Sequence, residues 1–193
     1  MAAVAVPVTV KTRIGYTPGQ RNVAELAYRL QEEGVAAIAI HGRTRACRFE
    51  GTAEHDTVAA VKARLRIPVF ANGDIRTPAQ ARAVLERTGV DGVMVGRAAL
   101  GAPWLLGMMA DPARLEPTLA EKWQVIAEHV AALHAFYGPG RGLRVARKHV
   151  QWYLEQLGVE PRGAASPVRA FHRLDDAAAQ LDWIAAMGLE QAA

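Results

Sequence analysis

Four short apolar stretches alternate with helical patterns along the first half of this chain, and each stretch ends on residues that can bind a ligand. These ends are Lys11, then His41, then Asn72, Gly73 and Asp74, and finally Gly96 and Arg97. Strand–helix alternation with short loops predicts a parallel α/β sheet with right-handed crossovers. The polar strand ends then meet at one edge, where such sheets build binding sites. A closed (β/α)8 barrel needs eight strands, so the four units of this chain predict half of such a barrel.

The apolar stretches predict strands over residues 6–11, 36–41, 69–71 and 92–95. Helices are expected over 23–33, 56–65 and 78–87, the last with Thr77 as N-cap and Pro78 at its first position. Because side chains of a strand alternate between its faces, Ile38 and Ile40 are expected to face the helices. Lys11 and His41 are then expected to point into the barrel.

The pattern changes after Pro103. Helical periodicity predicts three long helices over residues 119–137, 143–157 and 166–187, with no strand between them. We therefore expect an α/β domain over residues 1–110 and an all-helical domain over 111–193, with the Pro- and Asp-containing stretch 111–117 as the linker.

Composition narrows the class of protein. A hydrophobic content of 51% over 193 residues is sufficient for a core, and the net charge of +4 favours an anionic partner, although it also serves plain solubility. The single cysteine, Cys47, excludes an intramolecular disulfide and suits a reducing cytosol, so we expect a cytoplasmic protein. No apolar run is long enough to span a membrane.

Several strand-end residues have two interpretations. Gly96 and Arg97 suit a phosphate, because glycine permits close approach of backbone N–H groups and arginine adds charge; the alternative is a turn beside a solvated arginine. Lys11 could stabilise negative charge on a cofactor ring, or could pair with Asp74. His41 could donate to a cofactor or be a structural residue.

The helix expected over 143–157 has a basic face. Arg141, Arg144 and Lys148 are spaced three and four residues apart, with Arg147 and His149 beside them. Such a basic face favours contacts to a phosphate backbone.

Other residues of the chain offer weaker signals. For Trp152 and Tyr153, core packing is favoured over base stacking. His129 and His134 are five residues apart and off a common face, so no metal site is expected. Cys47 lies near Arg43, Arg45 and Arg48, which could lower its thiol pKa, but no partner base is evident.

An ordered set of motifs resembles one known family. The segments are VPVTVK (6–11), IHGRTRAC (40–47), IPVFANGDI (67–75), VGRAA (95–99) with Pro103 and Trp104, FYGP (136–139), and ARKHV (146–150) with Trp152 and Tyr153. Together they resemble the bacterial tRNA-dihydrouridine synthases, most closely the B-type branch, over nearly the whole chain.

The resemblance implies an FMN enzyme with a TIM barrel and a C-terminal helical domain, which reduces uridine in tRNA to 5,6-dihydrouridine using NADPH. It implies that Lys11 and His41 contact the flavin ring system, and that the ribityl-phosphate end is held by Asn72, Gly73, Asp74, Gly96 and Arg97. Contacts to tRNA are expected from Arg43, Arg45, Arg141, Arg144, Arg147 and Lys148. The full-length family member is expected to be a monomer.

In the family, the general acid is a cysteine in the first half of the barrel, and this chain resembles only the second half. We therefore assign no catalytic residue, leave Cys47 without that role, and expect a fragment that does not reduce uridine by itself. Two alternatives stay open. One is a catalytically inactive tRNA-binding module, and the other is an unrelated phosphate-binding barrel lyase.

Overall fold

The computed structural model describes residues 4–138, 140–159 and 166–192, and the chain divides into two compact units, residues 1–98 and 99–193. The first unit thus ends at Ala98, earlier than the boundary expected at residue 110. The short helix α4 (Trp104–Ala110) accordingly belongs to the second unit.

The first unit alternates strands and helices around one parallel sheet. Its elements are β1 (Thr9–Arg13), α1 (Val23–Glu32), β2 (Ala37–His41), α2 (His55–Lys62), β3 (Val69–Asn72), α3 (Pro78–Thr88) and β4 (Gly92–Met94). The strands pair in the order β1-β2-β3-β4, all parallel, which confirms the predicted α/β class. β1 begins and ends later than the predicted 6–11, because its pairing with β2 starts at Thr9 opposite Ala37 and ends at Arg13 opposite His41.

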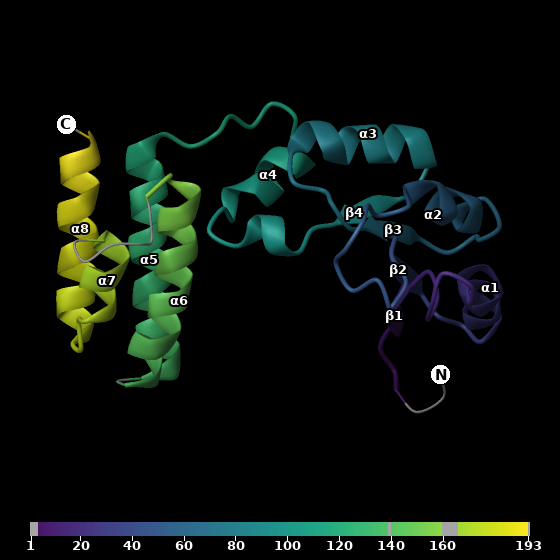
Figure 1. The fold of residues 1–193 in the computed structure, drawn as a ribbon, viewed down its shortest axis with the longest axis horizontal. Coiled ribbons are helices and arrows are strands. Elements are labelled where there is room, and N and C mark those ends of the chain that lie inside the picture. Colours follow the sequence, from purple (N-terminus) through teal and green to yellow (C-terminus); the bar gives the residue numbers. More distant parts are fainter. Residues whose placement is uncertain (1–3, 139, 160–165, 193) are drawn as a thin grey trace. The chain divides into compact units, whose positions relative to one another are not determined.

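One face of the sheet is covered by helices. Ile38, Ile40, Val69 and Ala71 have no solvent exposure, so these side chains pack under α1, α2 and α3, which follow one another along the same side of the sheet in Figure 1. This confirms the predicted orientation of Ile38 and Ile40. The opposite face carries the alternate residues of each strand and is the face on which a ligand can be bound.

Local signals set the ends of α3. The Thr77 side chain accepts a hydrogen bond from the Gln80 N–H at 3.1 Å, and Pro78 occupies the first helical position, as the sequence predicts. The helix ends at Gly89, whose φ of 64° is the left-handed conformation that glycine adopts without strain. These two signals fix both ends of α3, and β4 begins three residues after Gly89, at Gly92.

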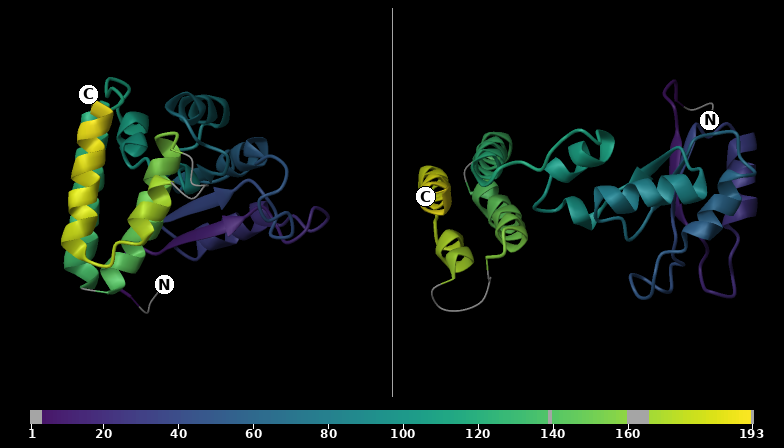
Figure 2. Two further views of the ribbon diagram at one scale, coloured as in Figure 1. Left: turned by 60° about the vertical axis from the view of Figure 1, so that its left-hand side comes forward. Right: turned by 90° about the horizontal axis from the view of Figure 1, so that it is seen from above.

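In its described part, the second unit contains helices and no strand. After a short 3-10 turn at Arg97–Ala99 its helices are α4, α5 (Leu119–Tyr137), α6 (Arg141–Gln156), α7 (Pro167–His172) and α8 (Ala177–Ala192). α5 packs against both α6 and α8 (Figure 2), around a core that includes Trp123, Ile126, Val150, Leu154 and Phe171. No helix among the described residues combines the length and the apolar character needed to cross a membrane.

The continuous helix predicted over residues 166–187 is wrong. The chain forms two helices, α7 and α8, with a break between His172 and Ala177. The Asp176 carboxylate accepts the Ala179 N–H at 2.8 Å and so starts a new helix, while the Leu174 carbonyl accepts a hydrogen bond from Arg147 at 3.1 Å. The helical period continues across this break, and for that reason periodicity alone did not reveal it.

Candidate functional site

The carboxyl ends of the four strands bring one row of residues together. Arg13, His41, Asn72 and Met94 stand in register across β1 to β4, and Lys11 lies one row below, opposite Ala39. Residues in register in a parallel sheet project from the same face, so Lys11 and His41 share a face, as predicted. Arg13 was missed by the sequence analysis, although it continues the alternation of Lys11 by two residues.

His41 is buried, with 6% of its surface exposed, and its Nε2 lies 3.4 Å from Nη1 of Arg43. Burial lowers the pKa of His41 to about 4, and the positive charges of Arg13, Lys11 and Arg43 act in the same direction. The ring is therefore neutral near pH 7. Because a guanidinium group only donates, Nε2 is the acceptor and the ring proton sits on Nδ1.

Lys11 is exposed on β1, the first strand of the sheet order. Its ammonium group is therefore in contact with water and carries no desolvation cost. The alternative ion pair of Lys11 with Asp74 is wrong, because the Asp74 carboxylate pairs with Arg43, with 2.6 Å between Oδ2 and Nη2. The Lys11 ammonium group thus remains available on the open face of the sheet.

The Arg43 side chain is only 5% exposed, and its guanidinium group is engaged in hydrogen bonds within the first unit. Its guanidinium group donates to the Asp74 carboxylate at 2.6 Å and to the carbonyl oxygens of Gly51 and Glu50 at 2.6 and 3.0 Å. Burial pushes the pKa of Asp74 upward, but the hydrogen bonds from the Ala53 N–H and from Arg43 outweigh it and lower the pKa. The expectation that Arg43 contacts RNA is corrected, since its side chain joins the loop after β2 to the loop after β3 instead.

The loop after β3 has an unusual backbone. Gly73 and Asp74 both adopt positive φ, at 114° and 55°. A Cβ at Gly73 would lie 2.7 Å from both Cδ2 of His41 and Cβ of Ala53, so only glycine fits beside the His41 ring. Asn72 donates from Nδ2 to the Met94 carbonyl at 2.6 Å, which ties the ends of β3 and β4 together. These residues therefore shape the edge of the sheet as much as they offer groups to a ligand.

Phe49 lies over the ends of the strands, a placement that no sequence signal indicated. Its ring centroid is 4.3 Å from the guanidinium carbon of Arg97 and 5.6 Å from that of Arg13, and the His41 ring centroid is 6.4 Å away. Phe49 itself is 57% exposed. The contact holds the Arg97 side chain near the row of Arg13 and His41.

Two further residues of the loop after β2 face other partners. Arg45 is exposed; its guanidinium carbon lies 5.2 Å from the centroid of the Tyr16 ring, and its Nη1 donates to the Tyr16 hydroxyl at 3.0 Å. The Cys47 Sγ accepts a hydrogen bond from the Thr44 hydroxyl at 2.9 Å. Arg45 is therefore available to an anion in solution, whereas the Cys47 sulfur is turned toward its own loop.

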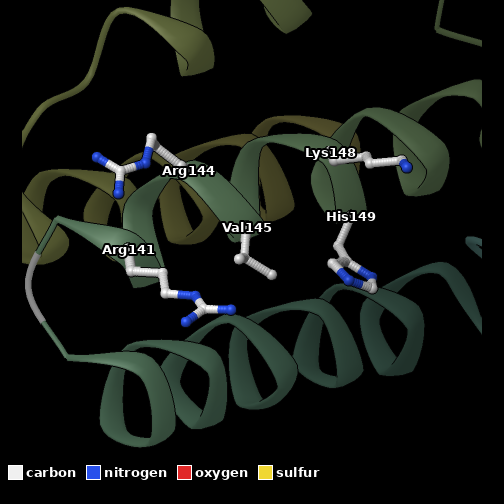
Figure 3. Close-up of a pocket in the computed structure, with 5 residues that line it drawn as sticks. All are labelled: Arg141, Arg144, Val145, Lys148 and His149. Atoms are coloured by element: carbon white, nitrogen blue, oxygen red, sulfur yellow. The ribbon is translucent and has the colours of Figure 1, made fainter.

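In the second unit, α6 carries a basic groove of about 500 Å³, lined by Arg141, Arg144, Val145, Lys148 and His149. Figure 3 shows Arg144 and Lys148 on one side of α6, with Arg141, Val145 and His149 on the side toward α5. The three cationic side chains are all exposed. This clustering places Arg141, Arg144 and Lys148 on a common surface, as their spacing predicts.

Aromatic rings flank this basic groove at both ends. The Arg141 guanidinium carbon lies 5.2 Å from the centroid of the Tyr137 ring, and the Lys148 Nζ lies 4.7 Å from that of Trp152. Cations held over aromatic rings keep a defined position while remaining exposed to an incoming anion.

Arg147 does not belong to the basic groove. It is half-buried, and its Nη2 donates to the Leu174 carbonyl at 3.1 Å, while its own carbonyl accepts from Nε2 of His172. Its Nε is buried and has no acceptor among the residues that the structure describes. The side chain of Arg147 thus holds α6 against the turn between α7 and α8, and its expected RNA contact stays a prediction that lies outside the basic groove.

The two histidines of α5 have separate partners. His129 Nδ1 lies 3.0 Å from the Tyr153 hydroxyl, and His134 Nε2 lies 2.9 Å from Oε1 of Gln180. Tyr153 is 3% exposed, so its core position is as predicted. Within the described ranges no group of three or more His, Cys, Asp or Glu residues is arranged to hold a metal ion.

Comparisons with known proteins agree with these observations. Residues 1–182 match the family model described as dihydrouridine synthase (Dus). The chain is 47% identical over 185 residues to tRNA-dihydrouridine synthase B of Escherichia coli strain K12, and 46% identical to the proteins of that name from Proteus vulgaris and Klebsiella pneumoniae. These alignments cover 93% of this chain and 56% of each relative, so the chain spans little more than half of their length.

Among solved structures, the chain aligns with a dihydropteroate synthase from Xanthomonas albilineans in complex with 7,8-dihydropteroate. The TM-score is 0.39 and the identity 17%, over 98% of this chain and 95% of that chain. A similarity at this level carries no argument about fold or function.

Proposed function

This chain belongs to the dihydrouridine synthase family, and on that premise we propose that it is part of a tRNA-dihydrouridine synthase. Because it spans 56% of its relatives' length, the activity is proposed for the whole protein. The reaction is the reduction of uridine to 5,6-dihydrouridine in tRNA, in the cytoplasm, with FMN as cofactor and NADPH as reductant. The parallel sheet is then part of a TIM barrel, with Lys11 and His41 on its inner face. An unrelated barrel lyase loses its support, since the family match extends over both units.

One observation carries the assignment of the site: the polar row of Arg13, His41 and Asn72 lies at the carboxyl ends of parallel strands, on the face that the helices leave open. This is the edge at which (β/α) barrels bind their ligands. The geometry supports a site at this edge, and the family match supports the flavin as its ligand.

The groups around Gly96 fit the phosphate of FMN. Among the described residues, the backbone N–H of Gly96 has no hydrogen-bond acceptor, and a Cβ at Gly96 would meet open space. Arg97 and Ala98 begin the 3-10 turn, and the first N–H groups of such a turn have no partner within it. Unpaired N–H groups beside an arginine form a donor set that suits an anion. We therefore assign Gly96 and Arg97 to the phosphate. Asn72 and Gly73 line the ribityl chain, and Asp74 acts by fixing the loop through Arg43.

At the other end of the row, Lys11 and His41 face the flavin ring. FMN supplies the hydride when it is bound. The exposed Lys11 ammonium group stabilises negative charge on the ring, and the neutral His41 offers its Nδ1–H as a donor. The target uridine has to leave its stack to reach this edge, as other enzymes that act on bases require.

The second unit supplies RNA contacts in this proposal. Arg141, Arg144 and Lys148 of the basic groove contact tRNA phosphates, and Arg45 adds a contact from the first unit. A formal net charge of +4 adds a sequence-independent attraction to the polyanion.

The test is a titration of the purified chain with FMN, followed by flavin fluorescence, with size-exclusion chromatography alongside. We expect saturable binding that weakens about tenfold or more in Arg97→Ala, because a charge-assisted contact to phosphate is lost. The matched control is Arg64→Ala, which removes one exposed arginine in the turn after α2 and should leave binding unchanged. Equal affinities of Arg97→Ala and wild type would contradict the phosphate assignment.

A second function is an RNA-binding module without catalysis. It is favoured by one observation: the basic groove lies entirely in the second unit, which has a hydrophobic core of its own. Salt-dependent tRNA binding by a chain that takes up no flavin would support this function over the first.

A further inference from the structure

A second pocket, of about 510 Å³, adjoins the basic groove within the second unit. We call it the histidine–tyrosine pocket; its lining includes Gly101, Pro103, Val125, Glu128, His129, His149 and Tyr153. His149 lines both the basic groove and this pocket. A ligand can therefore place one part among the cations of α6 and another part in the pocket.

Two histidines, a tyrosine and the Glu128 carboxylate are the polar side chains of the pocket, and Glu128 accepts a hydrogen bond from Gln124 Nε2 at 2.9 Å. Burial raises the pKa of Tyr153 to about 12, so its hydroxyl keeps its proton, and it shares a hydrogen bond of 3.0 Å with Nδ1 of His129. Burial also lowers the pKa of His129 and of His149, so both rings are neutral near pH 7.

These rings leave hydrogen-bonding edges unused. In the described part of the chain, neither nitrogen of His149 nor Nε2 of His129 hydrogen-bonds another residue. The two rings meet edge to face, with centroids 4.9 Å apart, and the His149 ring is 5.2 Å from that of Trp152. A flat polar ring entering the pocket would find both aromatic faces and unsatisfied donors and acceptors.

The walls of the pocket are fixed by close backbone packing. A Cβ at Gly101 would lie 2.2 Å from the carbonyl oxygen of Trp152, so the segment before α4 rests directly on the backbone of α6. Pro103 and Val125 add apolar surface. A preformed, partly apolar pocket with a few polar groups is typical of small-molecule and base-binding sites.

The chemistry of the two cavities indicates the ligand. Arg141, Arg144 and Lys148 offer only donors and positive charge, which suits a phosphate. The neighbouring pocket offers neutral imidazoles, a phenol and the Glu128 carboxylate, which can pair with the donors and acceptors of a heterocyclic base. A nucleotide unit contains both parts. Proteins that bind single-stranded RNA combine a basic groove with stacking platforms in this way.

We propose that the histidine–tyrosine pocket accepts an unstacked base of the RNA whose phosphates lie in the basic groove. This inference rests on the proposed RNA binding by α6 and adds a base contact to it. It makes His149 the residue that joins the phosphate and base contacts.

The test measures binding of a labelled single-stranded RNA by fluorescence anisotropy, using the whole chain. His149→Ala removes a ring of the pocket, and Val125→Phe fills the pocket without removing a polar group. Both should weaken binding about tenfold, the usual effect of losing one stacked base, with the salt dependence unchanged. Gln151→Ala, on α6 outside both cavities, is the matched control and should bind as wild type.

A series of RNAs, each with one abasic position, tests the base contact directly. One abasic position should weaken binding to wild type and have no further effect on Val125→Phe. Thermal unfolding followed by circular dichroism establishes that each variant is folded, and Tyr153→Phe, which retains the ring in the core, gives an independent variant that disturbs the same pocket.

The outcomes separate the two proposals. Salt-dependent RNA binding that is equally strong in wild type, His149→Ala and Val125→Phe would overturn the base pocket and leave the phosphate contacts standing. No RNA binding by wild type would overturn both. Binding of free uridine monophosphate more tightly than the oligonucleotide would assign the pocket to a free nucleotide and overturn the RNA assignment.

Discussion

At the scale of single residues, the candidate site depends on which partner each charged side chain finds. Arg43 and Arg97 both follow strand ends, yet Arg43 is buried on Asp74 while Arg97 rests on the exposed Phe49 ring. The first therefore maintains the shape of the site, and the second is free to move toward an anion.

His41→Gln should flatten the pH dependence of stability between pH 6.5 and 4. The pKa of His41 is lowered to about 4 in the folded chain, so in this window the unfolded chain binds a proton that the folded chain does not. Stability contributed by the neutral ring is complete above pH 6.5 and falls as the pH drops, by at most roughly 3 kcal/mol. Urea unfolding at several pH values measures it. Parallel curves for wild type and His41→Gln would show that the ring titrates normally.

Asp74→Asn should lower the free energy of unfolding by roughly 2–3 kcal/mol at pH 7, because it leaves the buried Arg43 without a countercharge. The pKa of Asp74 is lowered on folding, so this stabilisation is present above the ordinary carboxyl range and is lost as the pH falls below about 4. The difference in the free energy of unfolding between wild type and Asp74→Asn should therefore become smaller below about pH 4.

Glu25→Gln serves as the control for Asp74→Asn in the same urea unfolding experiment. It breaks the exposed Arg29–Glu25 pair of α1, whose side chains are 74% and 68% exposed. Exposed pairs contribute about 0–1 kcal/mol, so this change should be small. If Glu25→Gln and Asp74→Asn lower the free energy of unfolding by similar amounts, burial of Arg43 does not make its ion pair stronger than an exposed one.

At the scale of elements, helix ends show how local chemistry divides the chain. Thr118 starts α5 with a complete capping box, in which its hydroxyl accepts the Glu121 N–H and the Glu121 carboxylate accepts the Thr118 N–H at 2.7 Å. The same kind of polar start at Asp176 divides α7 from α8. A cap of this kind can start a new helix even where the helical spacing of apolar residues continues through the sequence.

Thr118→Ala should destabilise the second unit by about 1 kcal/mol, because the first turn of α5 loses its side-chain cap and the Glu121 N–H loses its acceptor. The unfolding of this unit can be followed by the fluorescence of Trp123, which lies in its core. Thr52→Ala, at an exposed loop position, should change little. A loss no larger than that of Thr52→Ala would mean that the tertiary packing of α5, and not its cap, sets its stability.

At the scale of the whole molecule, charge distribution matters more than net charge. The formal excess of +4 is modest, but three exposed cations gather on α6 around one groove. Clustered charges concentrate the positive potential and attract a polyanion more strongly than scattered ones do.

Arg144→Ala combined with Lys148→Ala should weaken tRNA binding and reduce the slope of log affinity against log salt by about two, one for each lost phosphate contact. Arg64→Ala combined with Arg82→Ala removes the same charge from exposed positions of the first unit and is the matched control. If both double variants lose the same slope, the binding reflects net charge and not the basic groove.

Much of the architecture could be predicted because it depends on short-range periodicity. Two-residue alternation placed Ile38 and Ile40 against the helices and put Lys11 and His41 on one face, and the structure agrees. The capping residue Thr77 located the start of α3. These features depend on neighbours in the sequence, and the pattern itself contains that information.

The role of each polar side chain was decided only by tertiary structure. Arg43 was expected at an RNA surface, but its partner Asp74 is 31 residues away in sequence and 2.6 Å away in space. Phe49, and the pocket around His129 and His149, likewise depend on contacts between distant segments. The sequence by itself determined the order of the elements and which residues share a face, because both follow from local periods. Tertiary structure alone decided which charges are buried and which are exposed, because that depends on the carboxylates and carbonyl groups that folding brings within hydrogen-bond distance.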